Sequence, residues 1–146
     1  MITKKAKYAL MALEILARNQ DNPMVIADIA RLGHIPKKFL ELILLELKKS
    51  YILDSKKGQG GGYFLRLSPQ DIRIAEVIRA LSGSMAPVAC LQDGTVCEEC
   101  EHHTPCMIRS LMGDVYEATN SVLMQETLQL LLERKNQMAG TEMFYI

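Results

Sequence analysis

This chain lacks any uninterrupted apolar run near the length of about 18 residues that a membrane-spanning helix needs. Its first apolar stretch, residues 8–17, is interrupted by Glu14 and lacks a cleavage site, so we expect no signal peptide. Cysteine is absent outside residues 90–106. We therefore expect a cytoplasmic protein, in which thiols stay reduced and clustered cysteines bind metal or act in redox chemistry more often than they form disulfides.

The net charge of the chain is zero, but its two halves carry opposite charges. Residues 1–66 carry 12 Lys and Arg against 6 Asp and Glu, whereas residues 67–146 carry 5 against 11. The first half therefore has a charge of +6 and suits a polyanion, and the second half has a charge of −6 and does not. With 49% apolar and 23% charged residues, the composition is typical of a globular protein.

The cysteines are concentrated in the segment CLQDGTVCEECEHHTPC, at Cys90, Cys97, Cys100 and Cys106. A thiolate is a soft ligand for zinc or iron, so four thiols this close together indicate one shared task. A free cysteine is often a small buried apolar residue, but this polar, glycine-interrupted segment is unsuited to a core. The segment predicts a metal-ligand cluster.

Three helices are expected in the first fifty residues. Thr3 is suited to cap a helix that reaches Arg18, and a short helix follows at residues 26–32. A turn at residues 33–36, containing glycine and proline, leads to a third helix that ends near Ser50 and begins with lysines. Two helices joined by a tight turn, the second basic at its start, are typical of a helix-turn-helix. A plain helical hairpin in a bundle is the alternative.

Residues 51–55 and 63–67 are strand-like and enclose the sequence KKGQGGG. This pattern predicts a β-hairpin with a basic, glycine-rich tip, which is the wing of a winged helix. Glycine permits positive φ and lets the backbone approach another molecule closely. Lys56 and Lys57 at such a tip can reach phosphates or the minor groove. The tip lacks the GxxxxGK and GxGxxG spacings, which argues against a nucleotide-phosphate loop.

The rest of the chain is expected to be helical apart from the cysteine segment. One helix is predicted at residues 70–81, and one long helix at residues 105–135, which has an apolar stripe and no internal proline. About 30 helical residues span roughly 45 Å, more than a small domain covers, so we expect this helix to pack on a second copy in a homodimer. A helix folded back on its own domain is the alternative.

We therefore expect a mainly α fold with a small β-hairpin wing. The expected organisation is a winged helix-turn-helix domain at residues 1–81, a cysteine-rich cluster-binding loop at 82–106, a dimerisation helix at 107–135 and a tail at 136–146. The charge of the first half favours double-stranded DNA as the partner of the winged helix-turn-helix.

Several segments resemble one known family. MITKKAKYALMAL, VIADIARLGHIPKKFLELILLELKKSYIL, KKGQGGGYFL and IAEVIRAL are similar to the Rrf family of bacterial winged-helix transcription regulators, in particular its IscR- and NsrR-like iron–sulphur members. The resemblance covers residues 1 to about 135. It implies a dimer made by the long C-terminal helix, bound to a palindromic operator. It also implies a loop with three cysteines that hold a cluster, commonly 2Fe–2S, whose state changes the affinity for DNA.

The resemblance places the cluster ligands residue by residue. Cys100 and Cys106 match the last two family cysteines. The first family cysteine matches either Cys97 or Cys90, and Cys90 is preferred because two ligands as close as Cys97 and Cys100 would crowd the loop.

The fourth ligand is where the chain departs from the family. Some members have a histidine three residues after the last cysteine, where this chain has Arg109, and others use an N-terminal acid of the partner, where this chain has Lys7. Neither cation can ligate a metal at neutral pH. The extra cysteine, His102 and His103 remain, and ligation by all four cysteines is the simplest solution.

The recognition helix is expected to enter the major groove with its N-terminal turn. Lysines there mostly contact phosphate, whereas Glu41 matches a base-reading position of the family and can accept from cytosine N4. Phe39 either faces DNA or staples the helix to the core, and each lysine has a solvated surface charge as its alternative. The predicted DNA contacts are Lys37, Lys38, Phe39, Glu41, Lys56, Lys57 and Gln59.

Three other functions are consistent with parts of the sequence. A structural zinc site fits the CxxC pair with a nearby histidine and a further cysteine. A thiol-redox enzyme would place its CxxC near a βαβ unit, and the sequence predicts no such unit. A winged helix used only for protein contacts would leave the basic first half unexplained. We therefore expect a DNA-binding regulator and not an enzyme.

Overall fold

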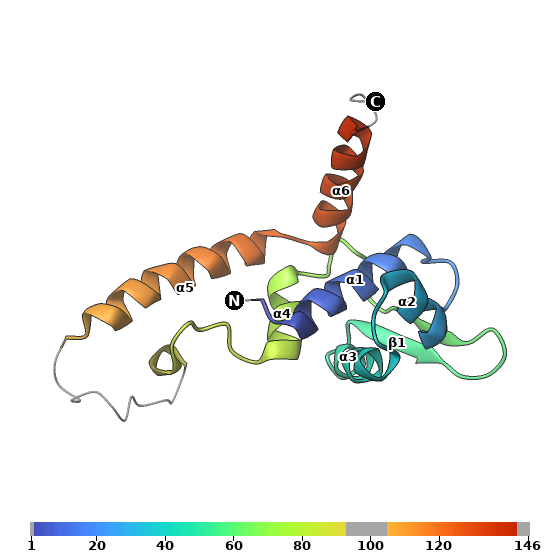
Figure 1. Ribbon diagram of the computed structural model, residues 1–146, viewed down its shortest axis with the longest axis horizontal. Helices are drawn as coiled ribbons and strands as arrows, with labels where there is room; N and C mark the ends of the chain where they lie inside the picture. The colour runs from blue at the N-terminus through green and yellow to red at the C-terminus, as the bar shows by residue number, and fades with distance from the viewer. Residues whose placement is uncertain (1, 93–104, 143–146) are drawn as a thin grey trace.

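The computed structural model describes residues 2–92 and 105–142. Cys97, Cys100, His102 and His103 lie outside these residues. The described elements are α1 (Lys4–Arg18), α2 (Ile26–Gly33), α3 (Lys37–Lys49), β1 (Leu53–Lys56), β2 (Gly62–Leu65), α4 (Ile74–Ser82), the 3-10 turn η1 (Ala89–Leu91), α5 (Met107–Gln125) and α6 (Leu128–Glu142) (Figure 1). None of the described helices has the length and apolar character required to span a membrane. The mainly α fold with a two-stranded hairpin is confirmed.

Helices α1, α2 and α3 form the helix-turn-helix body. The Thr3 hydroxyl accepts a hydrogen bond from the Ala6 amide at 3.1 Å, so α1 begins where the sequence predicts. The Lys5 ammonium contacts the Glu46 carboxylate at 2.6 Å and joins α1 to α3. The fully buried large side chains of the core come from α1, α2, α3 and the segments after them: Leu13, Leu16, Ile29, Leu40, Ile43, Leu44, Leu47, Leu53, Ile72, Val77 and Leu128.

The turn between α2 and α3 uses its glycine for packing. Gly33 is the last residue of α2, and a Cβ added there would lie 2.9 Å from Ile35 Cδ1. The left-handed position belongs to His34, whose φ is 49° and whose amide donates to the Ala30 and Arg31 carbonyls. The sequence predicted the turn correctly, but the helix ends one residue later than predicted because Gly33 fits the helical space beside Ile35.

The wing is a two-stranded antiparallel hairpin in which Leu53 pairs with Leu65 and Lys56 pairs with Gly62. Its second strand is also held by the segment before α2, because Met24 and Tyr63 exchange two backbone hydrogen bonds of 2.9 and 2.8 Å. Gly62 has a φ of 145°, and a Cβ there would lie 2.3 Å from the Met24 carbonyl oxygen. A glycine is therefore required at position 62, because a side chain there would clash with the Met24 backbone of the same chain.

The helix predicted at residues 70–81 begins later, at Ile74. Arg73 is extended, with φ −81° and ψ 136°, because it pairs with Thr127 in an antiparallel bridge. Residues 68–71 form a turn instead, in which the Asp71 amide donates to the Ser68 carbonyl at 2.8 Å. The apolar periodicity of the sequence predicted this helix, but the bridge between Arg73 and Thr127 determines where it begins.

The single long helix predicted at residues 105–135 is wrong. The helix is interrupted at residues 126–127. There the Ile74 amide donates to the Glu126 carbonyl at 3.0 Å, and the Leu128 amide donates to the Ile72 carbonyl at 2.9 Å. The Thr127 hydroxyl then accepts from the Leu130 amide at 3.2 Å and caps α6. Helix α6 continues to residue 142, so much of the predicted tail is helical.

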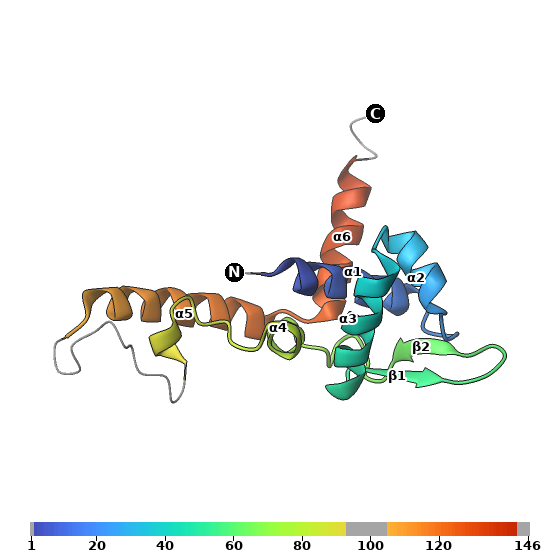
Figure 2. The same cartoon turned by 60° about the horizontal axis from the view of Figure 1, so that its bottom comes forward.

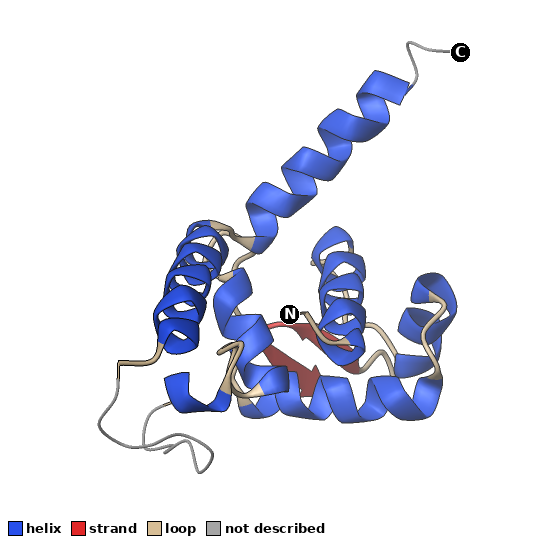
Figure 3. Cartoon of the chain, turned by 60° about the vertical axis from the view of Figure 1, so that its left-hand side comes forward, coloured by secondary structure: helices blue, strands red, loops and turns tan. Residues whose placement is uncertain are grey.

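Helix α5 and the wing project from opposite ends of the body (Figures 1 and 2). Helix α6 leaves the body in a third direction (Figure 3). Helix α6 is anchored in the core through Leu128, which is 2% exposed, and Leu132 packs against the same core one turn later.

Candidate functional site

The first turn of α3 presents an exposed basic surface. Lys37 and Lys38 are both exposed, and neither forms an ion pair within residues 2–92 and 105–142. Glu41 is exposed one turn further along the helix. The charges predicted to contact DNA are therefore available to a partner.

Phe39 occupies a different environment from its neighbours. It is half-buried, and its ring packs edge-on against Tyr8, with centroids 5.7 Å apart and an interplanar angle of 78°. It also packs against the hydrophobic core. This is the arrangement of a residue that staples α3 to α1, so Phe39 supports the position of the recognition helix.

The wing presents Lys56, Lys57 and Gln59, all of them exposed. Lys56 ends β1, and the other two belong to the connection between the strands. Gly58 and Gly60 flank Gln59 with φ values of 92° and 71°, which gives the tip its tight turn.

A side-chain link fixes the wing relative to α3. The Lys48 ammonium donates to the Ser55 hydroxyl at 2.5 Å and lies 3.7 Å from the Asp54 carboxylate. Since Ser55 belongs to β1, the last turn of α3 is tied to the first wing strand. Lys48 therefore has a structural contact, unlike the lysines at the start of α3.

Cys90 and Cys106 are the two cysteines that the structure describes, and both are half-buried. Cys90 is carried by η1, which packs on α5. Leu91 Cδ2 lies 4.0 Å from the position that a Cβ on Gly113 would take. The beginning of the cysteine segment thus lies against the N-terminal half of α5.

Cys106 is the N-cap of α5. Its Sγ accepts a hydrogen bond from the Arg109 amide at 3.4 Å. Cys106 Sγ thus lies at the positive end of the α5 helix dipole. The same residue therefore ends the cysteine segment and starts the helix.

The described residues contain no group of three or more His, Cys, Asp or Glu side chains placed to hold a metal ion. The predicted ligands Cys97 and Cys100, and the candidates His102 and His103, lie outside the described ranges. At the two positions where the resemblance implied a fourth ligand in other proteins, Lys7 is exposed on α1 and Arg109 is exposed in the first turn of α5.

Two arginines, Arg73 just before α4 and Arg79 within it, hold the C-terminal half of α5. Arg73 donates to the Met124 carbonyl at 2.8 Å, and Arg79 donates to Asn120 Oδ1 at 2.7 Å. Together with the Arg73–Thr127 bridge, these contacts fix one end of α5 on α4, while Cys106 lies at the other end. A helix of 19 residues separates the two ends by about 28 Å.

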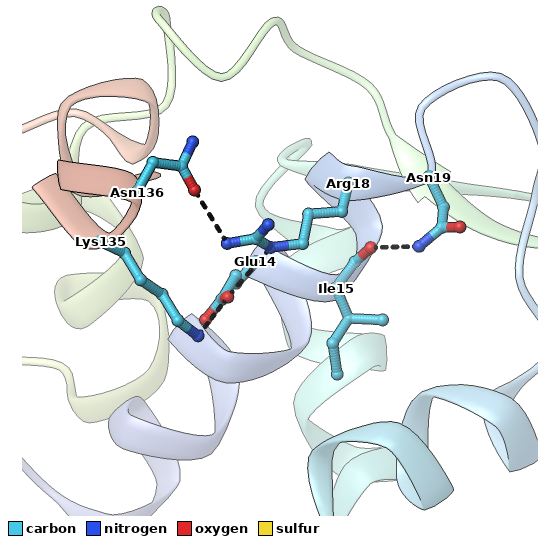
Figure 4. A network of polar contacts seen from close by, with 6 residues as sticks. All are labelled: Glu14, Ile15, Arg18, Asn19, Lys135 and Asn136. Atoms are coloured by element: carbon cyan, nitrogen blue, oxygen red, sulfur yellow. Dashed lines mark hydrogen bonds and ion pairs between the residues drawn. The ribbon is translucent and has the colours of Figure 1, made fainter. Parts of the chain in front are cut away.

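A polar network joins α1 to α6 (Figure 4). The Lys135 ammonium contacts Glu14 at 2.5 Å, and Arg18 contacts Glu14 at 3.1 Å and Asn136 at 3.4 Å. Burial raises the pKa of the Glu14 carboxyl, but the hydrogen bonds and charges of Lys135 and then Arg18 outweigh burial and hold this pKa below its usual value.

Known proteins resemble this chain over most of its length. The sequence model of the Rrf2 family, described as an iron-dependent transcriptional regulator, matches residues 2–134. The chain belongs to the Rrf2 family. As a member of this family it is a DNA-binding transcription regulator and not an enzyme.

Two relatives illustrate how much of this Rrf2 chain is shared. An Rrf2-like HTH-type transcriptional regulator of Rhodobacter capsulatus is 37% identical over 142 residues, which cover 93% of this chain and 95% of that protein. The HTH-type transcriptional regulator IscR of Aliivibrio salmonicida is 32% identical over 126 residues, which cover 84% of this chain and 71% of that protein.

Solved structures share the winged helix-turn-helix fold. CymR, the global cysteine regulator of B. subtilis, superposes with a TM-score of 0.74 at 27% identity, over 92% of this chain and 97% of that chain. The IscR of T. potens superposes with a TM-score of 0.76 at 24% identity, over 92% of this chain and 88% of that chain.

Sequence reasoning missed several residues of this Rrf2 chain that place its functional segments. Arg73, Arg79 and Asn120 fix α5 on α4, and no local pattern indicates these contacts because the partners are far apart in the chain. Thr127 did carry a signal, since a threonine before a run of leucines is a typical helix cap.

Proposed function

We propose that this Rrf2 regulator acts as a homodimer on a palindromic operator and that an iron–sulphur cluster in its cysteine segment controls its affinity for DNA. The observation that carries the proposal is the position of Cys106, which both ends the cysteine segment and caps the helix fixed to the DNA-binding body.

The apolar stripe of α5 supports a homodimer. None of the 19 residues of α5 is buried, and Leu111 is 58% exposed. The other large exposed side chains of the stripe follow a helical spacing: Met107, Ile108, Val115 and Val122. A single copy leaves this face in water, and a second copy would cover it.

A groove between α1 and α6 offers a second apolar surface to the same partner. It has a volume of about 740 Å³ and is lined by apolar side chains, including Leu10, Leu128 and Leu131. Lys4 and Lys7 lie along the groove, whereas α5 carries Asp114 and Glu117 near its stripe. This charge complementarity suits the α5 of a second copy.

The DNA-binding surface follows from the exposed cations. Lys37 and Lys38 at the start of α3 would contact phosphates at the edge of the major groove, and Glu41 would accept from cytosine N4. Lys57, supported by Lys56, would follow the backbone or minor groove beside it. Because a homodimer repeats this surface by symmetry, two half-sites at a fixed spacing are required.

The residues present fit an iron–sulphur cluster. Cys90, Cys97, Cys100 and Cys106 would supply four thiolates, and the two that the structure describes are half-buried next to the N-terminal half of α5. The positive end of α5 and the Arg109 guanidinium, exposed in its first turn, favour an anionic group there. When bound, a 2Fe–2S cluster supplies a redox-sensitive iron centre.

The fixed end of α5 supports the proposed control of DNA binding by the cysteine segment. A change in the conformation of the cysteine segment would displace Cys106 and η1. Because Cys106 caps α5 and η1 packs on it, the first half of α5 would move with them. Since Arg73 and Arg79 attach the second half to α4, and α4 packs on α1 and α3, the displacement would reach the helix-turn-helix body. A small rotation between the two copies then changes the half-site spacing.

The deciding experiment is the visible absorption spectrum of anaerobically purified protein, with iron, sulphide and zinc assayed on the same sample. We expect a brown protein with equal amounts of iron and sulphide, whose affinity for operator DNA changes when the cluster is removed. A colourless protein with stoichiometric zinc contradicts the proposal and indicates a structural zinc site. Single Cys→Ser variants at the four positions then identify the ligands.

The homodimer is tested separately by analytical ultracentrifugation of Leu111→Glu and Val115→Glu. Each variant places a charge in the apolar stripe and should dissociate the dimer. Leu130→Glu is the matched control, because Leu130 is an exposed leucine of α6 outside the stripe. Dissociation of the control to the same extent would contradict the assignment of the interface to α5.

A further inference from the structure

The outward face of α3 carries two exposed leucines. Leu42 is 56% exposed and Leu45 is 47% exposed. The opposite face of α3 is buried in the core through Leu40, Ile43, Leu44 and Leu47. At about 3.6 residues per turn, Leu42 and Leu45 point directly away from that buried face.

Folding of the chain does not explain this pair. Neither leucine belongs to the hydrophobic clusters of the described residues. A single exposed leucine is ordinary in proteins, but these two lie one turn apart at the centre of the face opposite the core. Lys38 and Lys49, both exposed, lie on the same face before and after the leucines. The face is therefore an apolar patch between cations.

We propose that Leu42 contacts the 5-methyl group of a thymine in the major groove and so determines part of the operator sequence. The proposal rests on the proposed function of α3 as the recognition helix. Leu42 lies in the second turn of α3, within the N-terminal half that approaches base edges, whereas Leu45 lies one turn further from them.

The chemistry of the groove selects this ligand. A leucine side chain offers methyl groups and no hydrogen-bonding atom. Thymine is the one base that presents an apolar group, its C5-methyl, in the major groove. Lys38, earlier on the same face, carries the charge that attracts phosphate, and the first half of the chain has a charge of +6. An apolar protein partner would gain nothing from these cations, so DNA is the favoured occupant.

The test removes the methyl group from the DNA and the side chain from the protein. Duplexes enriched by the wild-type protein from a random library are resynthesised with uracil in place of each thymine in turn. Uracil pairs like thymine but lacks the 5-methyl group. Wild-type protein should bind about fourfold more weakly at one thymine of each half-site, the loss expected for one buried methyl group.

The variants assign this loss to Leu42. Leu42→Ala should bind the thymine duplex more weakly and should no longer distinguish uracil from thymine at that position. Leu42→Met, which keeps an apolar chain of similar length, should retain the discrimination. Leu130→Ala removes an exposed leucine that belongs to α6 and not to α3, and this variant should behave as wild type.

The outcomes separate the two proposals. If Leu42→Ala distinguishes uracil from thymine as strongly as wild type at every position, the leucine contact is wrong while DNA recognition stands. The same holds if no uracil substitution weakens wild-type binding. If no sequence is enriched at all, sequence-specific recognition by α3 fails, and the leucine contact fails with it.

Discussion

Arg79 donates a hydrogen bond to Asn120 across 2.7 Å, and this contact joins α4, which follows the wing, to α5, which begins at Cys106. The same guanidinium approaches Met124 Sδ at 3.8 Å. Arg73 adds a hydrogen bond to the Met124 carbonyl one turn further along. The attachment of α5 to α4 therefore combines these polar contacts near the surface with the apolar packing of Leu123 against Ile74 and Ile78.

The first prediction concerns this attachment. Replacing Arg79 with Ala removes an exposed hydrogen bond, and we expect the free energy of unfolding to fall by about 0.5–1.5 kcal/mol. Urea unfolding of Arg79→Ala, Asn120→Ala and the double variant measures the coupling between the two side chains. A coupling of zero would show that this contact does not hold α5.

The second prediction concerns the wing. Lys57→Ala should weaken DNA binding and reduce the slope of log affinity against log salt concentration by about one unit, because one phosphate contact is lost. Gln59→Ala at the same tip is the matched control, since it removes no charge and should leave the slope unchanged. An unchanged slope for Lys57→Ala would remove Lys57 from the phosphate contacts.

The third prediction concerns the glycines of the wing. Gly62→Ala places a Cβ 2.3 Å from the Met24 carbonyl oxygen at a φ of 145°, so we expect a loss of stability above about 2 kcal/mol. Gly60→Ala has a positive φ of 71° but no atom within 4 Å of the added Cβ, so its cost should be about 1 kcal/mol. Chemical denaturation of the two variants compares them. Equal losses would mean that the Met24 contact is not the cause.

The fourth prediction concerns pH. Glu14 has a pKa below its ordinary value of 4.5 in the folded chain, because Lys135 and Arg18 outweigh the effect of burial. The ionised carboxylate therefore stabilises the fold above pH 4.5, and this stabilisation is lost as the pH falls through the lowered pKa. Glu14→Gln should be less stable than wild type at pH 7, and thermal unfolding at successive pH values should show the difference shrinking below pH 4.5. A difference independent of pH would contradict this assignment.

The helix-turn-helix could be predicted from the sequence because its signals are local. Thr3 caps α1 through an amide three residues away, and the apolar spacing of α3 corresponds to its buried face. The wing followed from its strands and glycines in the same way. The wing glycines were predicted to let the backbone approach another molecule. Gly62 instead lets the backbone approach Met24 of the same chain.

The C-terminal half was harder to predict because its contacts are distant. No proline or glycine marks the break at residues 126–127, and the apolar stripe continues across it. Backbone groups of Ile72 and Ile74, more than fifty residues earlier, bind the chain there and end α5. Hydrogen bonds between segments this far apart leave no periodic pattern in the sequence.

The sequence by itself determined the family, the wing and the concentration of thiols, because a few neighbouring residues set capping, turn geometry and ligand chemistry. Only the tertiary structure decided that Cys106 caps a helix whose other end is attached to α4. It also showed that Leu42 and Leu45 face away from the core at the centre of the recognition helix. Both features depend on tertiary packing, because the direction in which a side chain points depends on which face of its helix the remainder of the chain covers.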